Sequence, residues 1–152
     1  MRSHSDYLAL AHGALLPATE YAAILRQKLC FHLGKTVVLS RYAENGVFTP
    51  AKIAGALRTT RDEIAQTAGL GRDAILRKDR IASQKTQKRL REMVEILNKI
   101  EPRFGSELIA YAWYRSEPLP GFSGQTAMQL VRAGRAADVL DYIDAVDAGV
   151  FA

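Results

Sequence analysis

The chain has 152 residues, of which 48% are hydrophobic and 24% are charged, and its formal net charge at pH 7 is +5. This length and apolar content support one ordinary hydrophobic core or two small cores that share an interface, and they exclude a disordered tail. No stretch approaches the roughly 20 apolar residues that span a bilayer, and the N-terminus lacks the pattern of a secretion signal. The single cysteine, Cys30, excludes an internal disulfide, and no Cys or His spacing suggests zinc. We therefore expect a cytoplasmic protein without membrane segment, metal or cofactor.

The charge is distributed unevenly along the chain. Residues 58–91 contain ten Lys or Arg against four Asp or Glu, whereas residues 101–152 contain four against seven. A basic segment suits a polyanion such as DNA, and an acidic segment repels it. The two segments are therefore expected to have different partners.

Residues 1–48 are predicted to be an N-terminal extension that is partly helical and partly flexible. Apolar residues recur at helical spacing after Thr19 and stop at Gly34, which predicts one amphipathic helix. Cys30 and His32 lie in this helix without obvious partners, so we expect structural positions for them and no catalytic role.

A turn and a short helix are predicted next. Residues 35–42 carry β-branched side chains, but no second clear strand follows, so a helix or an extended link is expected. Asn45 and Gly46 are typical of a turn. A helix then begins with Thr49 as its cap and Pro50 at its first position, and it turns Ile53, Ala54 and Leu57 toward the core.

Residues 58–80 show the pattern of a helix-turn-helix. Thr60 or Thr59 can cap the first helix, which is expected to bury Ile64, Ala65 and Ala68. Gly69 follows Ala65 by four residues and can adopt a positive φ at the turn. Leu70 fills the corner, and a second helix over about residues 72–80 is expected to bury Ile75 and to display charged residues and Leu76.

In DNA-binding proteins of this pattern the second helix enters the major groove. Arg72 and Arg77 suit base recognition, because a guanidinium can donate two parallel hydrogen bonds to guanine. Lys78, Arg80 and Lys85 suit phosphate contacts. The predicted DNA-binding residues are Arg72, Asp73, Arg77, Lys78, Arg80 and Lys85. Lys78 occupies a position that is usually apolar in this pattern, which indicates a helix that ends early or packs loosely. A solvated basic face without DNA is the alternative interpretation.

The strongest predicted helix begins at Ser83 or Thr86 and runs to about Ile100. A stripe of apolar side chains at spacings of three and four defines its buried face, namely Leu90, Met93, Val94, Leu97 and Ile100. Pro102 marks a boundary, beyond which residues 101–152 are predicted to form a second unit.

Three helices are predicted in this second unit. The first covers residues 107–114 with Leu108, Ala112 and Trp113 near one face, and a loop rich in Pro and Gly follows it. The second runs from Thr126 to Val131, and the third covers residues 135–148. Four carboxylates recur on the third helix, namely Asp138, Asp141, Asp144 and Asp147. They indicate a solvated acidic edge or a contact for a basic partner, rather than a metal site.

An ordered series of short motifs runs from residue 104 to the C-terminus. They are Phe104-Gly105, Trp113, Pro118-Leu119, Gly124-Gln125-Thr126, Leu130 and Gly149-Val150-Phe151-Ala152. In this order and position they resemble the toxin-binding domain of the Xre/MbcA/ParS antitoxin family. The resemblance covers about residues 57–152, because that family places a helix-turn-helix just before the domain. The family commonly has Thr-Pro where this chain has Thr126-Ala127, a change that a first helical turn tolerates.

The resemblance implies an antitoxin whose partner is a RES-domain toxin, an enzyme similar in kind to ADP-ribosyl transferases that destroys cellular NAD. It also implies that the C-terminal region of the antitoxin covers the NAD pocket of the toxin. The implied toxin-binding residues are Gly149, Val150, Phe151 and Ala152. A short apolar terminus with one aromatic ring and a carboxylate suits a cleft for a flat ring and a phosphate. Burial of Phe151 on its own last helix is the alternative, and Trp113 is expected in the core.

The sequence thus predicts an all-α protein with a flexible extension at residues 1–48, a helix-turn-helix domain at 49–100 and a toxin-binding domain at 101–152. The favoured function is an antitoxin that also represses its own operon by binding operator DNA as a homodimer. The alternative is a free-standing repressor whose acidic C-terminal unit only dimerises it.

An enzyme is not expected. The three histidines, His4, His12 and His32, all lie near the N-terminus, and no serine, cysteine or carboxylate pair is spaced with them as a catalytic set. Gly69 and Gly71 are explained by the predicted turn and form no phosphate-binding loop.

Overall fold

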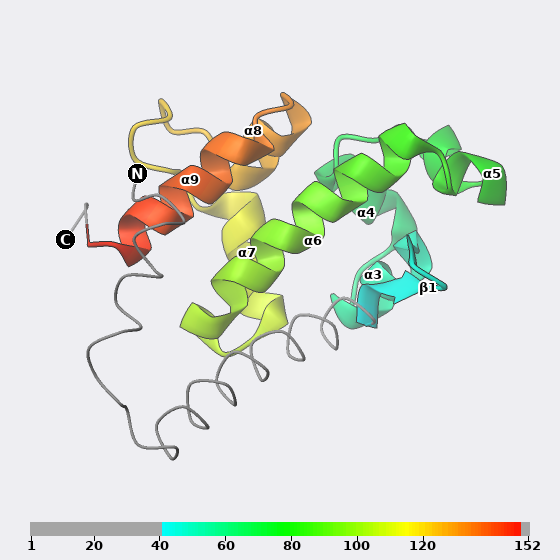
Figure 1. Ribbon diagram of the computed structural model, residues 1–152, viewed down its shortest axis with the longest axis horizontal. Coiled ribbons are helices and arrows are strands. Elements are labelled where there is room, and N and C mark those ends of the chain that lie inside the picture. The colour runs from blue at the N-terminus through cyan, green and yellow to red at the C-terminus, as the bar shows by residue number, and fades with distance from the viewer. Residues whose placement is uncertain (1–40, 150–152) are drawn as a thin grey trace, which may run out of the picture. The chain divides into compact units, whose positions relative to one another are not determined.

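The computed structural model of the chain describes residues 41–149, and Figure 1 shows how their helices are arranged. The helix predicted over residues 19–34, and the predictions for Cys30, His32 and residues 150–152, lie outside the described residues. Within residues 41–149, the predicted all-α fold is confirmed: seven α-helices accompany one small two-stranded sheet.

The sheet is a β-hairpin. The sequence predicted its turn at Asn45 and Gly46 but not its two strands. Strands β1 (Ala43–Glu44) and β2 (Val47–Phe48) pair antiparallel, with Ala43 opposite Phe48 and Glu44 opposite Val47. Asn45 and Gly46 both have positive φ, 52° and 78°. An Asn-Gly pair readily adopts this conformation, whose twist matches that of the two strands.

The helix-turn-helix region begins with two short helices whose caps were predicted correctly. Helix α3 (Pro50–Ala56) has Thr49 as its N-cap residue and Pro50 in its first turn. Helix α4 (Arg61–Thr67) is capped by Thr60, whose side chain accepts a hydrogen bond from the Glu63 backbone N–H. Their predicted core residues are buried, namely Ile53, Ala54, Leu57, Ile64, Ala65 and Ala68.

Helix α6 (Gln84–Phe104) is the longest element of the described residues and lies against α7, α8 and α9. Ser83 caps it, as predicted, and all five residues of the predicted stripe are buried. Ile96 is buried as well, because helices on more than one side of α6 require a wider apolar face. The predicted helix end at about Ile100 is wrong, since α6 continues through Pro102 to Phe104, and its C-cap residue Gly105 has φ of 63°.

The C-terminal segment consists of three further helices. They are α7 (Glu107–Ser116), capped by Ser106, then α8 (Ala127–Arg132) and α9 (Ala136–Asp147). A reciprocal capping box at Thr126 and Gln129 begins α8. The loop before it is tied across its base by an isolated bridge between Pro118 and Thr126.

The buried face of α7 differs from the prediction. Ala110, Tyr111 and Tyr114 are buried, whereas Ala112 is exposed and Leu108 and Trp113 are half-buried. Because nearly every residue of this segment is apolar or aromatic, its sequence leaves the angular position of the buried face undetermined. Trp113 still contacts the core from its edge.

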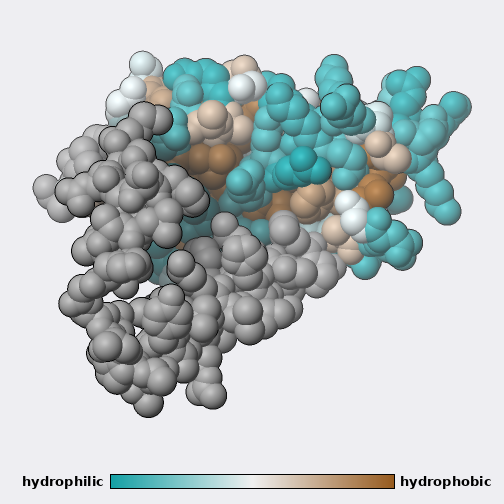
Figure 2. Space-filling view, in the orientation of Figure 1, coloured by the Kyte–Doolittle hydropathy of each residue, from teal (hydrophilic) through white to brown (hydrophobic). Residues whose placement is uncertain are grey.

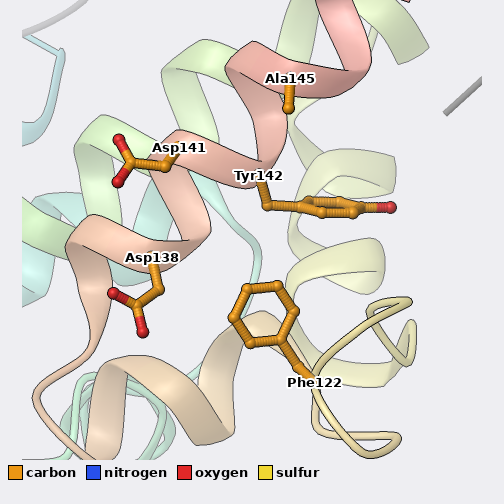
Figure 3. Close-up of a pocket in the computed structure, with 5 residues that line it drawn as sticks. All are labelled: Phe122, Asp138, Asp141, Tyr142 and Ala145. Atoms are coloured by element: carbon orange, nitrogen blue, oxygen red, sulfur yellow. The ribbon is translucent and has the colours of Figure 1, made fainter. Parts of the chain in front are cut away.

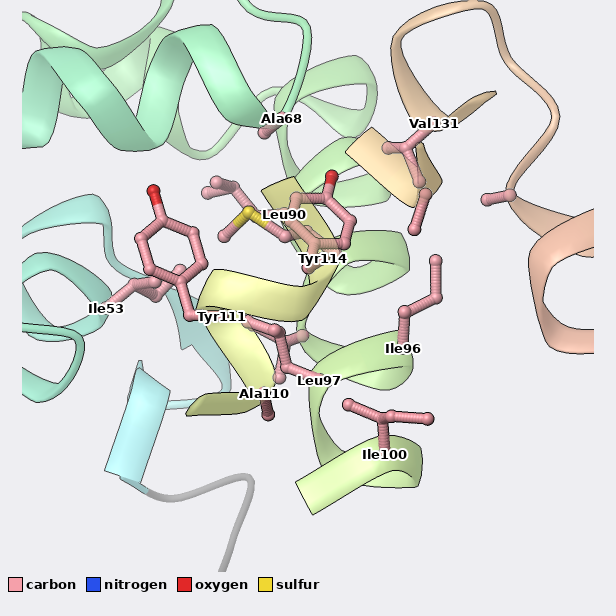
Figure 4. Packing of buried hydrophobic residues seen from close by; sticks show 14 of the residues in the cluster. Ile53, Ala68, Leu90, Ile96, Leu97, Ile100, Ala110, Tyr111, Tyr114 and Val131 are labelled. Atoms are coloured by element: carbon pink, nitrogen blue, oxygen red, sulfur yellow. The ribbon is translucent and has the colours of Figure 1, made fainter. Parts of the chain in front are cut away.

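One cluster of buried side chains connects the elements from the hairpin to α9. It includes Tyr42 at its start, Leu90 and Leu97 on α6, and Ile143 on α9. Figure 4 shows Tyr111 and Tyr114 of α7 packed among residues of α3, α6 and α8. The predicted domain limits at residues 48 and 100 stay predictions, and the second of them falls inside α6.

Candidate functional site

The turn of the helix-turn-helix has the predicted geometry. Gly69 has φ of 70°, and the Leu70 backbone N–H donates to the Ala65 carbonyl at 2.7 Å. A Cβ atom built on Gly69 would lie only 3.0 Å from the Arg132 Cα atom at the end of α8. Gly69 therefore permits the turn and also permits close packing between the turn and α8.

The predicted second helix over residues 72–80 is wrong as a single helix. A 3₁₀ turn, η2 (Arg72–Ile75), is followed by the short helix α5 (Lys78–Ile81), with Arg77 extended between them at φ −112° and ψ 143°. Ile75 is buried, but no residue of α5 is. Lys78 cannot supply the second apolar anchor that would hold a continuous helix against the core, which explains the break.

The structure leaves all six predicted DNA-binding side chains exposed at one end of α6. Arg72 donates to the Asp62 carboxylate at 2.7 Å, so part of its guanidinium is already engaged. Within the described part of the chain, no carboxylate pairs with Arg77, Lys78, Arg80 or Lys85. Figure 2 shows hydrophilic atoms over most of this end of the molecule.

A shallow depression lies within this surface. It has a volume of about 280 Å³. Its lining combines the glycine turn with the start of α6, namely Gly69, Leu70, Gly71, Asp73, Ala74, Arg80, Ser83, Lys85 and Thr86. Arg80 and Lys85 thus flank exposed backbone, an arrangement that suits an anionic group such as a phosphate.

A second surface lies between α9 and the loop before α8. Phe122 of the loop meets the Tyr142 ring edge to face at 6.0 Å, and the Arg135 guanidinium lies 5.5 Å from the centre of the Phe122 ring. Figure 3 shows the resulting groove, of about 320 Å³, with Asp138 and Asp141 on the adjoining side of α9. This combination suits a partner side chain that is both cationic and apolar. The sequence did not indicate it, because Phe122 and Tyr142 belong to different elements.

The acidic row of α9 is mostly paired within the chain. Asp144 accepts from Lys99 of α6 at 2.6 Å, Asp147 pairs with Arg103 of α6, and Asp138 pairs with Arg135 at 2.6 Å. The expected solvated edge is exposed at Asp141, Asp144 and Asp147, and two of its four carboxylates also attach α9 to α6. Such exposed pairs contribute roughly 0–1 kcal/mol each. In residues 41–149, no group of three potential metal ligands is close enough to hold an ion.

A buried polar network joins α4 to α7, and the sequence did not predict it. The Tyr114 hydroxyl donates to the Thr67 carbonyl at 2.8 Å, and the Tyr111 hydroxyl donates to the Thr67 hydroxyl at 3.4 Å. Burial raises the pKa of both tyrosines above the usual phenol value. Arg115 of α7 also pairs with Glu63 of α4. The helix-turn-helix and the C-terminal helices are thus joined by hydrogen bonds as well as by apolar packing.

Of the predicted toxin-binding residues, only Gly149 is described. It is exposed and has φ of 78°, directly after α9. Val150, Phe151 and Ala152 lie outside the described residues. No helix in residues 41–149 combines the length and hydrophobicity that a bilayer span requires.

These features define a class of protein: within residues 41–149, a mostly helical fold in which a helix-turn-helix with a basic surface packs onto a small C-terminal group of helices. Residues 101–149 match the family model of the antitoxin Xre/MbcA/ParS C-terminal toxin-binding domain, which confirms the resemblance over that segment. The match contains α7, α8 and α9 entirely. Searches of curated proteins and of solved structures find no match to the chain.

Proposed function

We propose that this protein is the antitoxin of a type II toxin-antitoxin system and that its partner is a RES-domain toxin that degrades NAD. The match of residues 101–149 to an antitoxin toxin-binding domain carries this proposal. The protein acts by binding and not by catalysis, and it works in the cytoplasm, where both its toxin and its operator DNA are accessible. Residues 101–152 bind the toxin and residues 49–100 bind the DNA.

The inhibitory contact is made by Gly149, Val150, Phe151 and Ala152, which cover the NAD pocket of the toxin. Support comes from the way α9 is held immediately before them. Lys99 and Arg103 of α6 pair with Asp144 and Asp147 in the last turn of α9, so the helix end has a defined position. A segment that starts from a fixed helix end loses less conformational freedom on binding than one attached to a mobile element.

The DNA contact is made by the basic end of α6, through Arg72, Asp73, Arg77, Lys78, Arg80 and Lys85 in a homodimer that represses its own operon. Four of these cations lack a carboxylate partner in the described residues, so their charge is available to phosphates. Binding is expected to weaken steeply with salt, because released counterions supply much of the affinity. Arg72 must share its guanidinium between Asp62 and a base.

A co-expression experiment tests the antitoxin function. The protein encoded by the adjacent gene, which the proposal requires to be a RES-domain toxin, is expressed with the full chain, with a chain lacking residues 149–152, or with Phe151→Ala. Leu76→Ala is the matched control, because Leu76 is also a large exposed hydrophobic residue but lies outside residues 101–152. Growth and cellular NAD are measured, and solubility of every variant is confirmed.

Rescue by the full chain and by Leu76→Ala, with loss of rescue by the truncation and by Phe151→Ala, is the expected result. Rescue by the truncation would support the antitoxin function but would assign the inhibitory contact to another surface, such as the groove at Phe122 and Tyr142. If no variant rescues while the full chain still binds its own promoter, the protein is a free-standing dimeric repressor.

A further inference from the structure

Leu76 is an exposed leucine directly before Arg77 and Lys78 of the basic surface. Its exposure is 66%, the highest among the large hydrophobic side chains exposed in residues 41–149, ahead of Ile109 at 52% and Phe104 at 37%. The other two lie near the opposite end of α6, which spans roughly 30 Å because it has 21 residues. Leu76 alone of the three is therefore close to the unpaired cations.

The backbone holds Leu76 in a defined place. It directly follows η2, whose last residue, Ile75, is buried with 2% exposure and anchors the segment to the core. Leu76 itself is in the α conformation, whereas Arg77 is extended and redirects the chain into α5. The leucine thus lies at the corner between η2 and α5, with Arg77 and Lys78 next to it in the chain.

An exposed apolar side chain followed in the chain by two cations, Arg77 and Lys78, fits one feature of duplex DNA. The cations of this surface suit phosphates, whereas the apolar group on the major-groove edge of a base pair is the C5-methyl of thymine. A leucine contributes nothing to phosphate binding, but contact with this methyl removes apolar area of both groups from water. The charge of the neighbouring side chains favours DNA over a second copy of this equally basic surface.

We propose that Leu76 is a specificity-determining residue that contacts a thymine methyl group in the major groove. This inference rests on the proposed DNA-binding function. It assigns to Leu76 a preference for thymine at one position of the operator, whereas the cations contribute affinity that does not depend on this methyl.

The test removes only the methyl group. A duplex is selected from a random pool by the full-length chain, and each thymine is then replaced singly by uracil. At one position the wild-type protein is expected to lose about fourfold in affinity, the effect of one methyl-sized apolar contact. Leu76→Ala is expected to bind the thymine and uracil duplexes equally. Ile109→Ala, which truncates a similarly exposed side chain far from the basic end, is expected to discriminate as the wild type does.

Two results would overturn the proposal. The first is selective DNA binding in which Leu76→Ala retains the full wild-type discrimination between thymine and uracil, or in which no thymine matters. The second is a change of oligomeric state in Leu76→Ala by analytical ultracentrifugation, with discrimination intact, which would assign the leucine to a contact between copies. If the full chain binds no duplex selectively, the DNA-binding function itself fails, and this outcome is recognisable before any variant is made.

Discussion

Substitution of Gly69 by alanine tests the packing between the helix-turn-helix and the C-terminal helices. Two costs are expected. The positive φ of 70° disfavours a residue with a Cβ by about 1 kcal/mol. The new Cβ would also lie 3.0 Å from the Arg132 Cα atom, and overpacking against backbone costs about 1–3 kcal/mol. Together these terms predict a loss of about 2–4 kcal/mol, a large fraction of typical domain stability.

Two other glycines serve as controls for this measurement. Gly105 also has a positive φ, 63°, but a Cβ atom added there would meet nothing within 4 Å, so Gly105→Ala isolates the conformational cost of about 1 kcal/mol. Gly71 has an ordinary φ of −75° and open space, so Gly71→Ala is expected to be nearly neutral. Urea unfolding followed by circular dichroism measures all three. If Gly69→Ala destabilises no more than Gly105→Ala, the described packing of the turn on α8 is wrong.

Three further predictions concern alkaline stability, helix capping and DNA recognition. Burial and the nearby Glu107 carboxylate raise the pKa of Tyr42 to about 12 from the usual value of 10.0. Its stabilising contribution is therefore complete below pH 10 and is lost as the pH rises toward 12, and urea unfolding of Tyr42→Phe should depend less on pH across this window. Thr126→Ala removes the cap of α8 and is expected to lower the unfolding free energy by about 1 kcal/mol, whereas an unchanged urea midpoint would contradict the capping role. Arg72→Ala is expected to reduce preference for the operator, and Lys78→Ala to weaken binding to all duplexes alike. Equal losses on operator and random DNA for both variants, measured by fluorescence anisotropy, would refute that division of roles.

The helix ends were predictable because their signals are local. Thr60 and Ser83, each one of two predicted candidates, cap α4 and α6, and Thr126, predicted as a helix start, caps α8. A side-chain oxygen near the first free backbone N–H groups is a property of a few consecutive residues. The turn at Gly69 and the buried stripe of α6 were predictable for the same reason. The C-terminal family could also be identified, because its motifs retain their order along the chain.

The candidate site was less predictable where a contact depends on how two secondary-structure elements are positioned relative to each other. Arg72 could be identified as an exposed cation, but its pairing with Asp62 depends on how α4 and η2 face each other. The helix breaks at Arg77 because no apolar side chain holds the next turn against the core. Lys78 indicated this weakness in the sequence, but the position of the break could not be predicted from it. The groove at Phe122 required the loop to fold back onto α9.

The sequence by itself determined the all-helical class, the helix caps, the glycine turn and the antitoxin domain, because each follows from residues that are near one another in the chain or keep a set order. Only the tertiary structure decided which face of α7 is buried, since seven of its ten residues are apolar or aromatic and could have met the core. It also decided that α6 continues past Pro102, and that Asp144 and Asp147 face Lys99 and Arg103 of α6. These outcomes depend on distances between residues far apart in sequence, and local preferences do not specify such distances.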